Sequence, residues 1–130
     1  MVIILDIHIW IWWLDNNSRL TERLRQIIAS HQSNGLGVSI FSCWEVEKLV
    51  EKNRLKLACS VDEWLNVALA YPGVQLLELT LPIVLKATQL EGFHNDPADQ
   101  IIVATAQIHN CPLLTADTKI VNYPYVQVLK

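Results

Sequence analysis

The chain alternates between short apolar runs and longer segments in which apolar and polar residues are mixed with helical spacing. Residues 2–5 form an apolar run that ends at Asp6, which is typical of a strand buried on both faces of a parallel sheet, and the next apolar residues predict a helix to about residue 14. Further strands are expected at residues 36–41, 74–79, 113–115 and 125–129, and further helices at residues 21–31, 43–52, 61–70, 82–91 and 97–109. This alternation predicts an α/β fold with a mainly parallel central sheet flanked by helices.

Local signals mark where two of these helices begin. Ser42 followed by Glu45 fits a capping box, in which the two side chains satisfy free backbone N–H groups. Asp96 followed by Pro97 resembles an N-cap with proline at the first helical position. Both signals place an acidic residue near a helix N-terminus.

Length and composition limit the class of protein. With 130 residues, of which 52% are hydrophobic, the chain is expected to form a single domain over residues 1–130. The apolar N-terminal segment contains Asp6 and His8 and is short of a membrane span. It shows neither a cationic region before it nor a small-residue cleavage site after it, so no secretory signal is expected, and the expected location is the cytoplasm. The three cysteines lie far apart, which supports neither a disulfide framework nor a zinc knuckle. Because the net charge is −3, binding to nucleic acid would need local basic groups or a bound cation.

Four carboxylates stand where a buried element ends or a helix begins. Asp6 and Asp117 follow expected strands, whereas Glu45 and Asp99 lie in the first turns of helices. In an open α/β sheet the ligand crevice lies at the carboxyl ends of the strands, so all four side chains can reach one edge. Carboxylates that share a site repel one another unless a divalent cation is bound between them. The pattern therefore predicts a metal-dependent hydrolase.

Each acid also has a structural explanation when it is taken alone. Glu45 could only complete the capping box, Asp99 could only favour the helix dipole, and Asp117 could form an Asx turn. The structural explanation is weakest for Asp6, because a buried carboxylate without partners destabilises a fold by more than a cap contributes. The combination, rather than any single residue, indicates a site.

The four acids and their neighbours resemble the motif series of PIN-domain ribonucleases. The motifs are LDIH with Asp6, SCWE with Glu45, DPADQIIVATA with Asp99 and LLTAD with Asp117. Their spacing and the run WEVEKLVEKNRLKL further resemble the VapC-like toxins of type II toxin-antitoxin pairs. The similarity covers essentially the whole chain, and DPADQIIVATA and LLTAD are its most specific parts.

The resemblance implies a PIN-like three-layer fold and an endoribonuclease that depends on Mg²⁺ or Mn²⁺. It makes Asp6, Glu45, Asp99 and Asp117 the catalytic and metal-binding acids, and we expect Asp6 and Asp99 to be the principal ligands. The implied substrate is RNA of the transfer or ribosomal class, and hydrolysis would leave 5′-phosphate and 3′-hydroxyl ends. The implied partners are a second copy of the chain in a homodimer and an antitoxin whose peptide arm obstructs the acidic pocket.

Accessory residues and two departures from the family pattern accompany the four acids. The accessory candidates are Asp96, Ser42 and Thr115, although an N-cap role is preferred for Asp96. Ile7 stands where the family usually has threonine or serine, which removes a polar contact to the site. Gln100 replaces the usual arginine, and with it a cation that could orient a carboxylate or a phosphate.

A basic stretch begins on the helix that carries Glu45. Its members Lys48, Lys52 and Arg54 are the candidates for RNA binding, because they could meet phosphates beside the acidic pocket. The alternative is a solvated helix face, since acidic residues are interleaved with the basic ones.

Histidines and tryptophans near the acids allow two interpretations each. His8 and His94 flank the acids without helical ligand spacing, so a supporting or loop role is preferred to zinc binding. Trp10 and Trp13 share a helical face, for which core packing is the first explanation. We nevertheless predict that the tryptophans near the N-terminus help to line the groove for the antitoxin.

Two further functions stay open beside the leading one. Ile7 and Gln100 are compatible with a non-catalytic PIN-like module that acts through protein or RNA binding alone. The motifs are also compatible with a PIN nuclease of RNA processing or DNA repair that is not a toxin. Inhibition by a chelator separates the enzyme from the binding module, and growth arrest on expression separates the toxin from the other nucleases.

Overall fold

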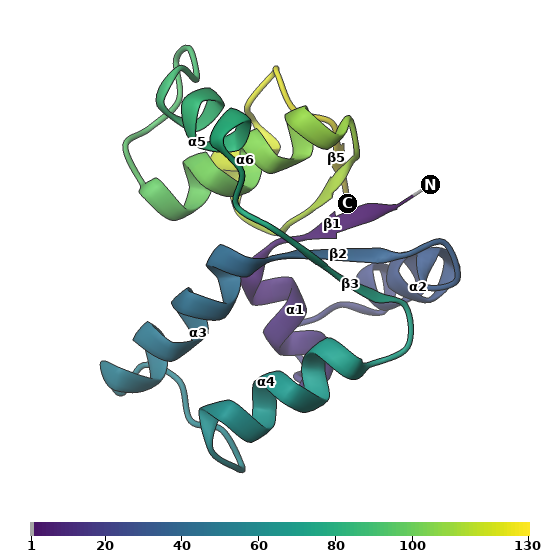
Figure 1. The fold of residues 1–130 in the computed structure, drawn as a ribbon. Coiled ribbons are helices and arrows are strands. Elements are labelled where there is room, and N and C mark those ends of the chain that lie inside the picture. Colours follow the sequence, from purple (N-terminus) through teal and green to yellow (C-terminus); the bar gives the residue numbers. More distant parts are fainter. Residues whose placement is uncertain (1) are drawn as a thin grey trace.

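In the computed structural model, which describes residues 2–130, parallel strands form a central sheet (Figure 1). The strands are β1 (Ile3–Leu5), β2 (Leu36–Ser39), β3 (Val74–Leu77), β4 (Leu113–Leu114) and β5 (Val128–Leu129). Within the described residues their order across the sheet is β3-β2-β1-β4-β5, and each neighbouring pair is parallel. The predicted α/β fold with a mainly parallel sheet is confirmed.

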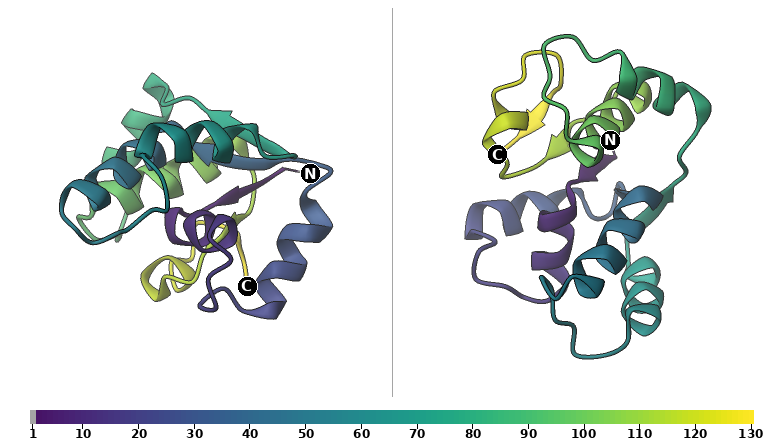
Figure 2. Two further views of the ribbon diagram at one scale, coloured as in Figure 1. Left: turned by 90° about the horizontal axis from the view of Figure 1, so that it is seen from below. Right: turned by 90° about the vertical axis from the view of Figure 1, so that its left-hand side faces the viewer.

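Helices cover both faces of this sheet. They are α1 (Ile7–Leu14), α2 (Glu22–His31), α3 (Ile40–Glu51), α4 (Val61–Ala70), α5 (Leu81–Thr88), α6 (Pro97–His109) and α7 (Thr118–Val121). The groups α1–α4 and α5–α6 lie at opposite ends of the molecule (Figure 2). None of the helices found in residues 2–130 is both long and apolar enough to cross a membrane.

Alternation along the strands divides the core between the two faces. Ile3 and Leu5 of β1 pack with α1, α2, α3 and α4, whereas Ile4 packs with α6 and α7. Helix α5 packs on the outer side of α6, where Ile83 meets Ala104. The chain therefore forms the three layers of helix, sheet and helix that the resemblance implies.

The tryptophans near the N-terminus have different environments. Trp10 is fully buried and meets Trp64 edge-on, with ring centroids 5.0 Å apart. Trp13 is half-buried and packs against the exposed Tyr71 at 4.9 Å. The prediction of a groove-lining role is wrong for Trp10, because its ring has no surface to offer, and it stays a prediction for Trp12 and Trp13.

The start of α3 differs from the prediction. Strand β2 ends at Ser39, whose Oγ accepts a hydrogen bond from the Phe41 N–H at 3.1 Å and so caps α3. Ser42 is a buried residue inside the helix, and its proposed capping box with Glu45 is wrong. The expected strand over residues 36–41 is correspondingly too long, because a nearby serine provides the same cap one turn earlier.

Other boundaries agree more closely. Helix α4 has the predicted bounds, and α6 begins after Asp96, whose Oδ1 accepts from the N–H groups of Ala98 and Asp99 at 3.0 and 3.2 Å. The predicted N-cap at Asp96 is therefore confirmed. The expected strands over residues 74–79 and 125–129 are shorter in the structure, and the short helix α7 was not predicted.

Candidate active site

The order of the strands places a topological switch point, where the strand order reverses, between β1 and β4. After β1 the chain moves outward through β2 and β3, and it then returns to the other side of β1 to form β4. In open parallel sheets, ligands bind at such a reversal, outside the carboxyl ends of the strands. Asp6 directly follows β1 and Thr115 directly follows β4, and the Thr115 hydroxyl donates a hydrogen bond to Asp6 Oδ2 at 2.7 Å. This hydrogen bond links the ends of the two strands that flank the switch point.

Asp6 is held rigidly at the end of β1. Its N–H donates to the Leu114 carbonyl at 3.0 Å, and its Oδ1 accepts from the Ile7 N–H at 2.8 Å, which caps α1. The residue is only 6% exposed. Burial raises the pKa of Asp6, and hydrogen bonds from Thr115 and Ile7 lower it only in part. A carboxylate in this position would be stabilised by a bound cation.

Asp117 combines a structural role with proximity to the other acids. Its Oδ1 accepts from the Lys119 N–H at 2.9 Å and caps α7, so the Asx turn considered from the sequence is confirmed. Its own N–H donates to Thr115 Oγ1 at 3.1 Å, which links it to Asp6 through one threonine. Its charge also helps to raise the pKa of both Asp6 and Asp99.

Glu45 lies one turn further into α3 than the sequence indicated, and it faces the acids. Burial raises the pKa of Glu45 to about 8, and the charges of Asp6, Asp96 and Asp99 contribute to this shift. Repulsion of this kind requires the side chains to lie near one another. Glu45 therefore belongs to the acidic cluster although its predicted local role is wrong.

Asp99 lies in the first turn of α6 and contacts the preceding loop. Its Oδ2 is 2.7 Å from Nε2 of His94, and its side chain is 18% exposed. Burial raises the pKa of Asp99, the hydrogen bond to His94 lowers it, and the charges of Asp96, Asp117 and Asp6 raise it further. The four acids singled out from the sequence thus act on one another electrostatically.

The chemistry of the cluster fits a hard divalent cation. Its donors are carboxylate oxygens, which Mg²⁺ and Mn²⁺ prefer over the nitrogen and sulfur ligands typical of zinc. Burial, and to a smaller extent the charges of neighbouring acids, raises the pKa values of Asp6, Glu45 and Asp99, and a bound cation would stabilise their ionised forms. Over residues 2–130, no three acidic, histidine or cysteine side chains already form a ligand cage, so binding would draw the carboxylates inward.

The two residues that depart from the family pattern, Ile7 and Gln100, make other contacts near the acids. Ile7 is a buried core residue that contributes only its N–H to Asp6, while the Thr115 hydroxyl supplies a polar contact from β4. Gln100 uses its amide Nε2 to hold the His94 carbonyl at 3.1 Å. Neither departure removes an acid from the cluster.

The candidates for RNA binding differ in whether their charges already contact other side chains. Lys48 Nζ lies 3.3 Å from Glu51 Oε2 and 5.5 Å from the ring centroid of the exposed Trp44, so its charge is used locally. Lys52 and Arg54 are exposed in the turn after α3. Binding of RNA by these residues stays a prediction, as does an accessory role for Ser42.

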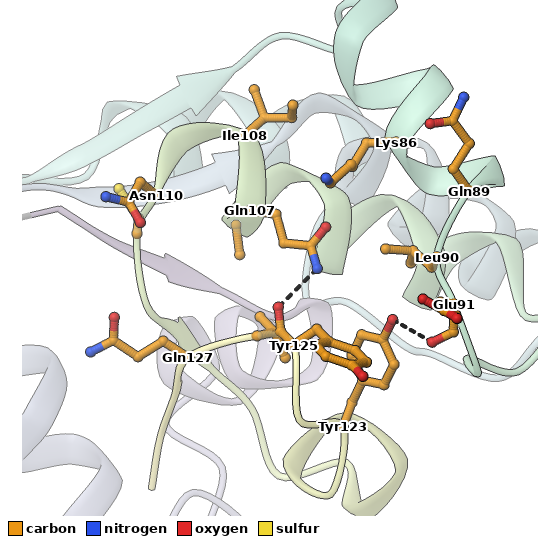
Figure 3. Close-up of a pocket in the computed structure, with 13 residues that line it drawn as sticks. Lys86, Gln89, Leu90, Glu91, Gln107, Ile108, Asn110, Tyr123, Tyr125 and Gln127 are labelled. Atoms are coloured by element: carbon orange, nitrogen blue, oxygen red, sulfur yellow. Dashed lines mark hydrogen bonds between the residues drawn. The ribbon is translucent and has the colours of Figure 1, made fainter.

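A cavity of about 640 Å³ lies away from the acids. It is lined by the end of α5 and the residues that follow it, by the C-terminal part of α6 and by the C-terminal segment, and Figure 3 shows Lys86, Gln107 and Tyr125 beside it. The Gln107 amide donates to the Tyr125 carbonyl at 2.8 Å, and the Tyr123 hydroxyl donates to the Glu91 carbonyl at 2.8 Å. These contacts attach the C-terminal segment to α6 and to the loop between α5 and α6, and none of the four acids lines the cavity.

A parallel sheet with carboxylates gathered at its switch point defines an α/β protein with an acidic, hydrolase-like centre. The family model for the PIN domain matches residues 3–124, and the chain belongs to this family. Ribonuclease VapC22 of Mycobacterium tuberculosis is 32% identical over 119 residues, which cover 91% of this chain and 88% of that relative.

Solved structures show the same fold at lower sequence identity. One is VapBC2 from Rickettsia felis bound to a DNA fragment from their promoter, with a TM-score of 0.75, 15% identity, and coverage of 99% of this chain and 98% of that chain. Another is FitAcB from Neisseria gonorrhoeae, with a TM-score of 0.70, 22% identity, and coverage of 98% and 96%. These similarities confirm the PIN-like fold.

Proposed function

We propose that the chain is a metal-dependent endoribonuclease, the toxin of a type II toxin-antitoxin pair, which acts as one domain in the cytoplasm, where its RNA substrates are. The observation that carries the proposal is the convergence of Asp6, Glu45, Asp99 and Asp117 at the switch point of a PIN-domain sheet. The 32% identity to a ribonuclease of similar length supports RNA as the substrate.

The proposed cofactor is Mg²⁺ or Mn²⁺, with Asp6 and Asp99 as principal ligands. When bound, the ion would polarise a phosphate oxygen, acidify a water molecule and stabilise the departing 3′ oxygen. Glu45, whose pKa is raised by burial and by the charges of Asp6 and Asp99, would complete the site or orient the attacking water through a hydrogen bond. Asp117 completes the negative charge of the site from the β4 side. The products would carry 5′-phosphate and 3′-hydroxyl ends.

The proposed protein partners are a cognate antitoxin and a second copy of the chain. VapBC2 and FitAcB, which share this fold, support a toxin that acts in a complex. Large apolar side chains are exposed on α3, on and after β3, and on α5, and they are suited to protein contacts. They are Ile40, Trp44, Leu76, Leu79, Leu81, Val84 and Leu85.

The test of the proposal is cleavage of a structured RNA pool by the purified chain with Mn²⁺ or Mg²⁺. We expect cleavage that disappears with a chelator and in Asp99→Asn, and mapping of the ends would identify the transfer or ribosomal RNA target. The Asp99→Asn sample controls for contaminating nuclease. If the folded wild type and the variant are equally inert toward every RNA, the non-catalytic binding module is the better explanation. Growth arrest on expression, absent with Asp99→Asn, would distinguish the toxin from a housekeeping nuclease.

Removal of two exposed cations should weaken RNA binding. In the cleavage-defective Asp99→Asn background, replacing Lys52 and Arg54 with alanine should raise the Kd for RNA and reduce the salt dependence of log Kd by about 0.7 per lost phosphate contact. Binding is measured by fluorescence anisotropy at several salt concentrations. A matched double substitution of the exposed Arg19 and Lys86 controls for net charge. Equal effects of the two pairs would mean that Lys52 and Arg54 form only a solvated surface.

A further inference from the structure

His94 contacts one of the proposed metal ligands from outside the four-acid set. It lies in the loop between α5 and α6, and its Nε2 is 2.7 Å from Oδ2 of Asp99. The two side chains are 26% and 18% exposed, so solvent competes only partly for this contact. An ionised carboxylate oxygen can only accept a hydrogen bond, so we assign the shared proton to Nε2 of His94.

The imidazole of His94 is fixed from two further directions. Its ring packs against Phe93, with centroids 4.3 Å apart, and Phe93 packs in turn against Tyr123 at 4.7 Å. Its backbone carbonyl accepts from Nε2 of Gln100 at 3.1 Å. Because Gln100 is the residue that departs from the family's arginine, this chain has exchanged a cation for an amide that holds the loop.

We infer that His94 is a positioning residue that fixes the orientation of the Asp99 carboxylate for cation binding. The inference rests on the proposed function, because it assigns a role toward the cation of that same site. With Oδ2 engaged by Nε2–H, the carboxylate cannot rotate freely, and Oδ1 is left with its lone pairs available. Hydrogen-bond partners that orient a ligand typically contribute about 10–100-fold to metal affinity.

The test measures Mn²⁺ affinity by isothermal titration calorimetry on the full chain, so that the readout does not depend on cleavage. His94→Ala should weaken Mn²⁺ binding by about 10–100-fold. His94→Gln should recover most of the affinity, because its amide Nε2 can donate to Asp99 as the imidazole does. His94→Phe keeps a ring against Phe93 but has no donor, and it should match His94→Ala. His109→Ala, an exposed histidine at the far end of α6, is the control and should bind as the wild type does.

Thermal unfolding without cation shows which variants are folded, and if His94→Ala is not, the comparison of His94→Gln with His94→Phe decides. Wild-type affinity in a folded His94→Phe or His94→Ala would overturn the inference while leaving the proposed function in place. Equal losses in His94→Gln and His94→Phe would also overturn it, because His94 would then act as a ligand itself or through its shape. A folded wild type that neither binds Mn²⁺ nor cleaves RNA would overturn the proposed function, and the inference with it.

Discussion

Asp6→Asn is expected to reduce RNA cleavage by at least about a thousandfold while leaving the fold intact. The substitution removes a charge at the centre of the switch point, and loss of several kcal/mol of metal-dependent stabilisation corresponds to a rate effect of this order. An asparagine oxygen can still accept the Ile7 N–H and cap α1. Because a buried, repelled charge is removed, the Tm without cation should equal or exceed that of the wild type.

Cleavage rates and thermal unfolding are measured on the same preparations. The matched control is Asp62→Asn, which makes the same chemical change at an exposed position in the first turn of α4. Cleavage by Asp6→Asn within a few-fold of the wild type would exclude Asp6 from the catalytic centre. A large fall in Tm would instead mean that the negative charge of Asp6 supports the fold, contrary to the sign expected from its raised pKa.

The second large effect is an unusual dependence of stability on pH. The pKa of Glu45 is about 8 in the folded protein, compared with an ordinary value of 4.5. Between these pH values the folded protein keeps a proton that the unfolded chain has lost, so stability falls as pH rises. The raised pKa values of Asp6 and Asp99 act in the same direction. In cation-free buffer we expect a higher Tm near pH 5 than near pH 8.

Divalent cations should reverse this trend, because they favour the ionised carboxylates. If one proton leaves when the ion binds, the Kd for Mn²⁺ should decrease by up to about tenfold for each unit by which the pH is raised toward 8. The rise in Tm caused by Mn²⁺ should therefore be larger at pH 8 than at pH 5. Scanning calorimetry across this pH range, with and without Mn²⁺, measures both effects.

Two substitutions on α3 separate Glu45 from general charge effects. Glu45→Gln should flatten the dependence of Tm on pH, because it removes a group whose pKa is raised from 4.5 to about 8. Glu47→Gln alters an exposed glutamate on the same helix and should leave the dependence unchanged. Identical pH profiles for the wild type and Glu45→Gln would show that Glu45 titrates normally and does not face the other acids.

Much of the site could be predicted because its residues follow from the order of elements. Parallel strands place their carboxyl ends at one edge, so acids after apolar runs converge there whatever the details of packing. Asp6 and Asp117 were located in this way, and the cap at Asp96 was evident from the proline that follows it. The link through Thr115 could not be located as securely, since a hydroxyl at a strand end has no distinctive pattern.

The errors arise where local signals compete or where packing decides. Ser39 and Ser42 are both plausible caps, and the selection of Ser39 depends on where β2 leaves the sheet. Trp10 and Trp13 share a helical face in sequence, but the position of α4 buries the first ring against Trp64 and leaves the second beside Tyr71. Periodicity alone does not specify which neighbour will cover a given side chain.

The hydrogen bond between Thr115 and Asp6 joins residues that are 109 positions apart in the chain. A nascent chain that ends before residue 113 has neither β4 nor Asp117, and its Asp6 lacks the hydrogen bond from Thr115. The acidic cluster can therefore assemble only after residues 113–117 have been added and β4 has paired with β1.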